Sequence, residues 1–186
     1  MRFLRPRLVW PALAVAAVIL GLALAAFQPW RLFTNRSVHE ALPAPVAAGA
    51  VNAPATVSPD AGVPSVSGVT VLATGRFLSH EHNTSGTVRL LRLSDGRRIL
   101  RLEDLDTSDG PALHVWLSDQ PVLGGRSGWG VFDDGAHVDL GGLKGNRGDQ
   151  NYPVPPEADL SRLTSVSVWC VRFHISFGAA SLAPVT

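Results

Sequence analysis

Short β-like segments separated by turn residues make up the chain from residue 69 onward, and this pattern constrains the fold more than any other feature. The clearest unit is residues 86–105, in which two strand-like halves flank Asp95-Gly96, a dipeptide suited to a two-residue hairpin turn. No long amphipathic helix interrupts the pattern. The fold class that we predict is therefore all-β, with one antiparallel β-sandwich or barrel over residues 69–186.

Alternation of apolar and polar residues predicts which side chains of a strand share a face. In residues 112–118, one face carries Leu113, Val115 and Leu117, and the other carries His114, Trp116 and Ser118. Residues 165–177 read as the longest strand, and their expected core face consists of Trp169, Val171, Phe173, Ile175 and Phe177. The opposite face would then carry Val166, Val168, Cys170, Arg172 and His174.

An uninterrupted apolar run without any charge, residues 8–27, precedes the β region and is long enough to cross a bilayer as a helix. Arg2, Arg5 and Arg7 stand before it, so residues 1–7 should stay in the cytoplasm and the remainder should lie outside the cell membrane. We favour an uncleaved single-pass signal anchor held in the lipid bilayer. A cleavable signal peptide remains the alternative, because residues 23–25 read Ala-Leu-Ala, a small-x-small pattern.

Between this run and the β region lies a segment that we predict to be a juxtamembrane piece followed by a disordered linker, residues 28–68. Its larger part, residues 41–68, is rich in Pro and Ala, has five prolines and carries a single charge, Asp60. Such a composition gives a semi-extended tether rather than a packed element.

Charge excludes one class of partner. From residue 75 onward the chain has 11 basic and 13 acidic residues, and no basic stripe is present. Nucleic acid is therefore not an expected partner.

Cysteine occurs once, as Cys170, so the chain cannot form an internal disulfide. Two interpretations follow. Cys170 is either a small apolar filler, as free cysteines most often are, or a reactive thiol favoured by Arg172 on the same predicted face.

Four stretches in order are similar to one known family: GRFLSHEHNTSGTV, GPALHVWLS, LGGLKGNRGDQNYPVP and SVSVWCVRFHISFGAASL. Together they cover about residues 75–183 and resemble the electron-transfer DM13 (DM-thirteen) domain of exported bacterial proteins. The resemblance implies an all-β domain whose characteristic cysteine, here Cys170, takes part in redox chemistry as a bare thiol or as a ligand to a prosthetic group such as haem. His82, His114 and Trp116 fall within the matched motifs, as do Gly148, Gln150, Asn151 and Tyr152, without assigned roles.

Several histidines and aspartates are candidate metal ligands. His80 and His82 would share a face of an extended segment, and His114 and His174 lie on predicted strands, but no recognised metal-binding spacing is present. Asp104, Asp106 and Asp109 lack the ligand order of a calcium loop. We therefore predict no metal site, and only His82 and His114 are kept beside Cys170 as cofactor-binding candidates for a haem, if any cofactor is bound.

The function that we expect is a membrane-anchored, extracytoplasmic domain with a redox or electron-transfer role centred on Cys170 and served by a redox partner protein. The alternative is a non-catalytic envelope module that binds a protein or ligand and in which Cys170 is structural.

Overall fold

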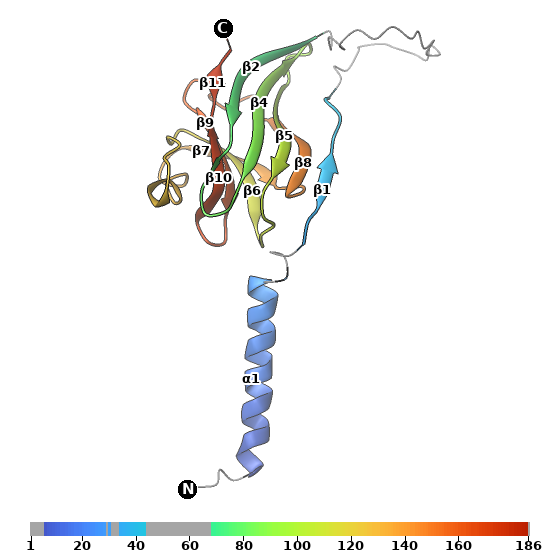
Figure 1. Cartoon of the computed structure of the whole chain (residues 1–186), viewed down its shortest axis with the longest axis vertical. Coiled ribbons are helices and arrows are strands. Elements are labelled where there is room, and N and C mark those ends of the chain that lie inside the picture. The colour runs from blue at the N-terminus through green and yellow to red at the C-terminus, as the bar shows by residue number, and fades with distance from the viewer. Residues whose placement is uncertain (1–5, 29, 31–33, 44–67, 186) are drawn as a thin grey trace, which may run out of the picture.

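A computed structural model describes residues 6–28, 30, 34–43 and 68–185. In the described residues the helix α1 (Pro6–Phe27) comes first, and a β-rich body follows it (Figure 1). The helix coincides with the apolar run identified in the sequence, and its large side chains, among them Trp10 and Leu22, are exposed. Within the described residues, no helix combines the length and the apolarity that a membrane span requires.

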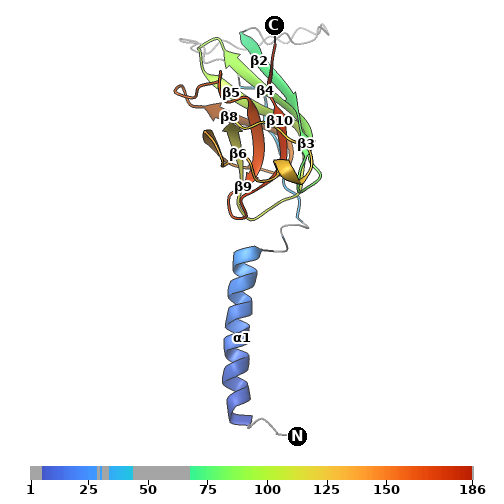
Figure 2. The same cartoon turned by 90° about the vertical axis from the view of Figure 1, so that its left-hand side faces the viewer.

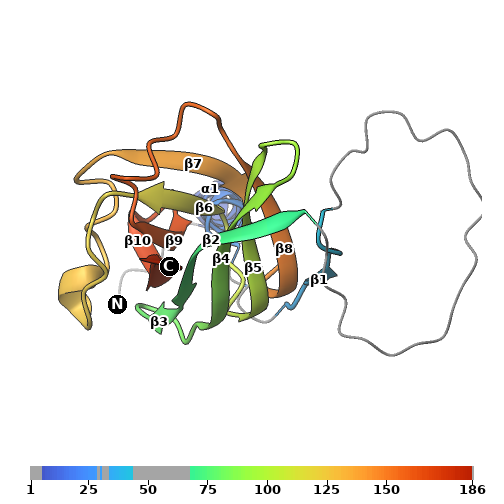
Figure 3. The same cartoon turned by 90° about the horizontal axis from the view of Figure 1, so that it is seen from above.

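The β-rich body is a sandwich of two sheets, which confirms the predicted all-β class. The first sheet has the order β1-β8-β5-β4-β2-β11 and the second has the order β3-β10-β9-β6-β7. All strand pairs are antiparallel except β1 with β8. Figure 2 shows strands of the second sheet, and Figure 3 shows the two layers from above. The strands are β1 (Ser37–His39), β2 (Val69–Arg76), β3 (Leu78–Ser79), β4 (Ser85–Leu93), β5 (Arg98–Asp106), β6 (Leu113–Ser118), β7 (His137–Gly142), β8 (Arg147–Val154), β9 (Ser165–Cys170), β10 (Ile175–Ser181) and β11 (Ala183–Pro184).

The hairpin predicted around Asp95-Gly96 is formed by β4 and β5. Its turn is one residue longer than predicted: Leu93 N–H donates to Arg97 O, and Gly96 N–H donates to Leu93 O. Gly96 has a φ of 84°, in the left-handed region that glycine adopts without strain. Gly96, the third residue of this turn, therefore has the positive φ angle that we expected in a two-residue turn.

The main core lies between the two sheets and contains the inward face of β6, as the alternation predicted. Val115 and Leu117 are fully buried there, with Val166 of β9 and Leu100 and Leu102 of β5. A second cluster lies on the outer face of the second sheet, where Trp116 and Trp169 are covered by Val122, Val131 and Phe132 of the segment between β6 and β7. This segment also carries the short 3-10 helix η2 (Arg126–Gly128).

The predicted single strand over residues 165–177 is wrong. The chain turns at residues 171–174 and returns as β10, so Val171 and Phe173 are 38% and 48% exposed instead of buried. The predicted faces are reversed for residues 166–170, whereas Ile175 and Phe177, also predicted on the core face, do pack in the core with Cys170. Val166, Val168 and Cys170 point into the space between the sheets, and Trp169 points outward under the β6–β7 segment.

Residues 34–43 of the predicted juxtamembrane and linker segment lie against the domain. Residues 37–39 form β1, which pairs in parallel with β8 at the edge of the first sheet (Figure 3). Residues 44–67, which hold most of the predicted Pro/Ala-rich linker, lie outside the described residues. The described segment of residues 34–43, which contains the three-residue strand β1, therefore lies on the surface of the β-sandwich.

Candidate functional site

Cys170 is the last residue of β9, between β6 and β10. It pairs with Leu113 of β6 and with Ile175 of β10, and its side chain is 0% exposed. Leu113, Val168 and Phe177 form a buried cluster with the thiol. Partly buried Phe77, Leu143 and Ile175 complete the apolar surroundings. The thiol is free, and nothing can reach the sulfur from solvent without movement of the surrounding side chains.

Arg172 does not share a face with Cys170, contrary to the prediction. It is exposed in the turn at residues 171–174, because the chain reverses one residue after the cysteine. The predicted activation of the thiol by this guanidinium was based on a continuous strand, which the chain does not form.

His82 and His114, the two histidines predicted beside Cys170, are held apart from the thiol. The ring of His82 packs on the ring of Phe177, with centroids 3.9 Å apart, and its Nε2 is paired with the Glu81 carboxylate. Phe177 in turn belongs to the buried cluster of Cys170. A phenyl ring therefore separates His82 from the sulfur.

His114 lies on the opposite face of the second sheet. Directly paired residues of antiparallel strands point to the same side, and His114 pairs with Trp169 whereas Leu113 pairs with Cys170. The Nδ1 atom of His114 is 2.8 Å from Oδ2 of Asp139. The structure therefore does not bring the three predicted site residues together.

A stack of aromatic rings runs from the protein surface to the residue next to Cys170. The exposed ring of His137 lies 4.1 Å from the ring of Trp116 at an interplanar angle of 8°, and Trp116 lies 5.1 Å from Trp169 at 26°. Phe132 packs edge-on against Trp169 at 6.2 Å. Trp169 is fully buried and is covalently joined to Cys170 through one peptide bond. The sequence placed Trp116 and Trp169 on two predicted strands, but only the pairing of β6 with β9 shows that these strands are neighbours and that the two rings stack.

The indole N–H groups of this stack have no hydrogen-bond acceptor among the described residues. Nε1 of Trp116, of Trp169 and of the nearby Trp129 is buried without a partner. An unsatisfied buried donor costs about 1–3 kcal/mol, so such groups are rare in native proteins. An indole without an acceptor also keeps its proton when it loses an electron, because no group is in place to take the proton.

A family model described as Electron transfer DM13 matches residues 76–182 of the chain. The chain belongs to this family. The matched residues begin in β2 and end after β10, so the DM13 domain includes the aromatic stack and Cys170 but not α1 or β1. No curated protein and no solved structure matches the chain.

Haem, the prosthetic group that the resemblance implied, does not fit Cys170 in this DM13 domain. An axial ligand needs an open face beside the sulfur for a flat macrocycle, whereas the sulfur is enclosed by apolar side chains from three strands. His82 and His114 cannot complete the ligation, because one lies behind Phe177 and the other lies on the opposite face of the sheet. In the described part of the chain, no group of three or more His, Cys, Asp or Glu residues is arranged to hold a metal ion.

His80, a candidate metal ligand with His82 from the sequence, has a different environment from His82 in the DM13 domain. Its Nδ1 lies 2.8 Å from Ser176 Oγ, and its Nε2 lies 3.1 Å from Leu123 O. The hydroxyl of Ser167 in turn donates a hydrogen bond to Ser176 Oγ. Burial lowers the pKa of His80 below its usual value, although the bond to the Leu123 carbonyl acts in the opposite direction. His80 and His82 therefore contact different residues and do not form a shared site.

The glycine-rich motif of the DM13 domain forms a loop closed by Gln150, which is fully buried. Its Oε1 accepts from the N–H groups of Lys144 and Gly145 and from the hydroxyl of Tyr152, and its Nε2 donates to Gly145 O at 2.6 Å. Burial raises the pKa of Tyr152 to about 12, so this hydroxyl stays protonated as a donor. The loop thus presents its backbone and Asn151 at the β8 edge of the sheet.

Proposed function

We propose that the DM13 domain of this chain is a redox module in which electrons leave Cys170 through the stack of Trp169, Trp116 and His137. The observation that carries the proposal is the continuity of this stack from an exposed ring to the residue bonded to Cys170. The membership of the chain in an electron-transfer family points to the same class of function.

The enclosure of the thiol supports electron transfer over direct thiol exchange. A partner thiol would have to attack the sulfur along a line that apolar side chains now fill. Transfer of an electron needs no such contact. In the proposed step, an external one-electron acceptor takes an electron from Trp116. Trp169 then reduces the oxidised Trp116. The thiol of Cys170 then reduces the oxidised Trp169 and gives its proton to a water molecule, which enters when the surrounding apolar side chains move, because the sulfur is otherwise closed to solvent.

Photo-oxidation of the full chain tests this function. A photogenerated tris(bipyridine)ruthenium(III) ion serves as the one-electron oxidant, and the remaining Cys170 thiol is titrated after unfolding. We expect thiol loss in the wild type and at least tenfold slower loss in Trp116→Phe, which interrupts the stack with a less easily oxidised ring. Trp129→Phe is the matched control, because Trp129 also has a buried indole N–H but lies outside the stack. Equal thiol loss in Trp116→Phe and the wild type would refute the route.

Membrane anchoring by residues 8–27 and an extracytoplasmic position of the domain are further parts of this proposal. They are supported by the absence of any charge in this run and by the three arginines before it. The proposal predicts that the expressed chain stays in the membrane pellet after carbonate extraction, and that an added protease digests the domain in spheroplasts. Release of the chain by carbonate would contradict the anchor.

A second candidate function is a binding module in which Cys170 only fills space, and the full burial of the thiol among apolar side chains favours it. This reading predicts a colourless protein whose thiol reacts with a maleimide only after unfolding and is not consumed in the photo-oxidation experiment. The two candidates therefore differ in one measurement on the same protein.

A further inference from the structure

An N-terminal segment outside the DM13 domain adds a strand to the edge of its first sheet. Ser37, Val38 and His39 of β1 lie opposite residues 147–149 of β8 in parallel register. Two backbone hydrogen bonds lie at the ends of the paired strands: Arg147 N–H donates to Arg36 O at 3.3 Å, and Glu40 N–H donates to Asp149 O at 2.9 Å. Addition of an extended segment to a free sheet edge is one of the common ways in which domains bind peptides.

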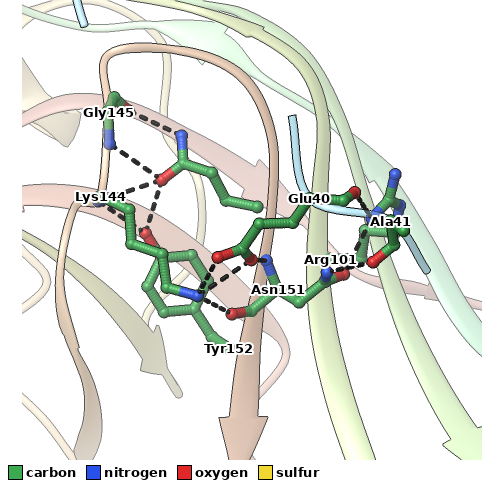
Figure 4. Close-up of polar contacts among 8 residues, drawn as sticks. Glu40, Ala41, Arg101, Lys144, Gly145, Asn151 and Tyr152 are labelled. Carbon is green, nitrogen blue, oxygen red and sulfur yellow. Dashed lines mark hydrogen bonds and ion pairs between the residues drawn. The ribbon is translucent and has the colours of Figure 1, made fainter. Parts of the chain in front are cut away.

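Glu40 fixes the end of this segment. Its carboxylate accepts two contacts from Lys144 Nζ, at 2.8 and 2.9 Å, and one from the backbone N–H of Asn151 at 2.7 Å (Figure 4). Burial raises the pKa of Glu40, but the hydrogen bonds and charges of Lys144, Asn151 and Arg101 outweigh this effect and hold it below the usual value. A carboxylate is thus the form that the site stabilises.

Side chains of the domain also bind the backbone of the segment. Arg101 Nη1 donates to Glu40 O at 3.0 Å, and Asn151 Nδ2 donates to Ala41 O at 2.8 Å (Figure 4). At the other end, Arg36 N–H donates to Asn146 Oδ1 at 2.7 Å. Such contacts recognise an extended backbone independently of its side chains, so the specificity of the site comes from Glu40.

Two glycines of the domain leave room for this backbone. A Cβ atom at Gly145 would lie 2.4 Å from Arg36 O, and one at Gly148 would lie 2.2 Å from Val38 O. Both distances are too short for any side chain. The glycine-rich motif, for which the sequence suggested no role, therefore shapes the β8 edge to fit a strand.

The segment is separable from the sandwich core. Ser37 and His39 are exposed and Val38 is half-buried, so β1 contributes little to the core between the sheets. The apolar contact of the segment is made by Leu42, which packs at the side of a small cluster around Leu91 and Ile99. All of the residues that hold the segment lie within the family match, and the segment itself lies outside it.

We propose that the β8 edge and the loop at residues 144–146 form a strand-binding site for an extended segment with a carboxylate at the position of Glu40, which residues 34–43 occupy reversibly. Whether residues 34–43 are bound determines the length of chain that connects α1 to the domain. With the segment bound, only residues 28–33 connect α1 to the docked strand, which span about 20 Å when extended. With the segment released, residues 28–68 connect α1 to β2 and reach on the order of 140 Å.

Hydrogen–deuterium exchange on the full chain tests reversible occupancy. Glu40→Lys places a cation against Lys144 and should release the segment. We expect the amides of Arg147 and Asn151, which donate to the segment, to exchange at least tenfold faster, while amides of β5 keep their protection. The control is Glu157→Lys, the same charge change at an exposed residue away from the site. Unchanged exchange of Arg147 and Asn151, or equal acceleration in β5, would overturn the proposal.

A labelled peptide of residues 34–43 tests the site in trans by fluorescence anisotropy. The Glu40→Lys chain, whose own segment is released, should bind the peptide at least tenfold more tightly than the wild type, whose site is filled from the same chain at a high effective concentration. A peptide that itself carries Glu40→Lys should not bind. Equal binding of both peptides, or equal binding to both chains, would overturn the proposal whether or not Cys170 proves to be redox-active.

Discussion

Trp116 and Trp169 stack across neighbouring strands with their ring centroids 5.1 Å apart, and both indole N–H groups are buried without an acceptor among the described residues. The stacking contributes to stability, whereas the two unsatisfied donors subtract from it. A pair of phenylalanines would fill much of this space without buried donors. The indoles therefore bury two donors that phenylalanine would not, and they differ from phenylalanine in being more easily oxidised.

Replacing Trp116 by phenylalanine should lower the free energy of unfolding by no more than about 1–2 kcal/mol, because the lost ring area is partly offset by removal of an unsatisfied N–H. Trp116→Ala should cost about 3–5 kcal/mol, since it leaves a cavity beside Trp169. Urea denaturation followed by circular dichroism measures both. A loss in Trp116→Phe as large as in Trp116→Ala would mean that the indole N–H has an acceptor in solution.

Replacing Cys170 distinguishes an apolar site from a polar one. Cys170→Val keeps an apolar group of similar size and should cost less than about 1.5 kcal/mol, whereas Cys170→Ser buries a hydroxyl among apolar side chains and should cost about 1–3 kcal/mol. The measurement is the urea midpoint of each variant beside the wild type. A serine variant more stable than the valine variant would show that water reaches this position.

His80 should make the domain less stable in mild acid. Its pKa is lowered in the folded state by burial, so between that value and about 6.5, its ordinary value, the unfolded chain binds more protons. The stabilisation is complete above about pH 6.5 and decreases as the pH falls below it. We expect the urea midpoint to fall between pH 7.5 and pH 5.5, and to fall less in His80→Gln. An unchanged pH dependence of the urea midpoint in His80→Gln would contradict this assignment.

Gly148 at the β8 edge and Gly141 in β7 offer a matched comparison. Both have positive φ angles, 93° and 112°, so alanine strains the backbone at each. Only the Cβ at position 148 would collide with β1, because nothing lies within 4 Å of the position at residue 141. Gly148→Ala should therefore release residues 34–43 to trypsin cleavage after Arg36, and Gly141→Ala should not. Equal protection of Arg36 in the two variants would contradict the described fit.

The features predicted from local pattern were those in which a single strand or turn determines the structure. The alternation of residues 113–118 gave the correct faces of β6, and Asp95-Gly96 marked the β4–β5 hairpin. The run from Ser165 to Phe177 misled because its turn contains neither glycine nor proline. Instead, His174 takes the left-handed conformation, with a φ of 52°, and the reversal exchanges the inner and outer faces.

Features that depend on distant pairs could not be predicted. The anchor of β1 joins Glu40 to Lys144, 104 positions apart, and a three-residue strand has no hydrophobic periodicity of its own. The stack of Trp116 on Trp169 depends on the register between β6 and β9. Cys170 itself was identified from the sequence, but its closed environment became clear only once three strands were placed around it.

The docking of β1 attaches the sandwich to the N-terminal part of the chain by non-covalent contacts as well as by the peptide chain. Because residues 34–43 are held by the β8 edge, a cut anywhere in residues 44–67 leaves two fragments that still adhere through strand pairing and the contacts of Glu40. After such a cut, the sandwich stays with the piece that carries α1 only while residues 34–43 are docked. A release of the segment, which only lengthens the tether of the intact chain, would free the domain of the cut chain.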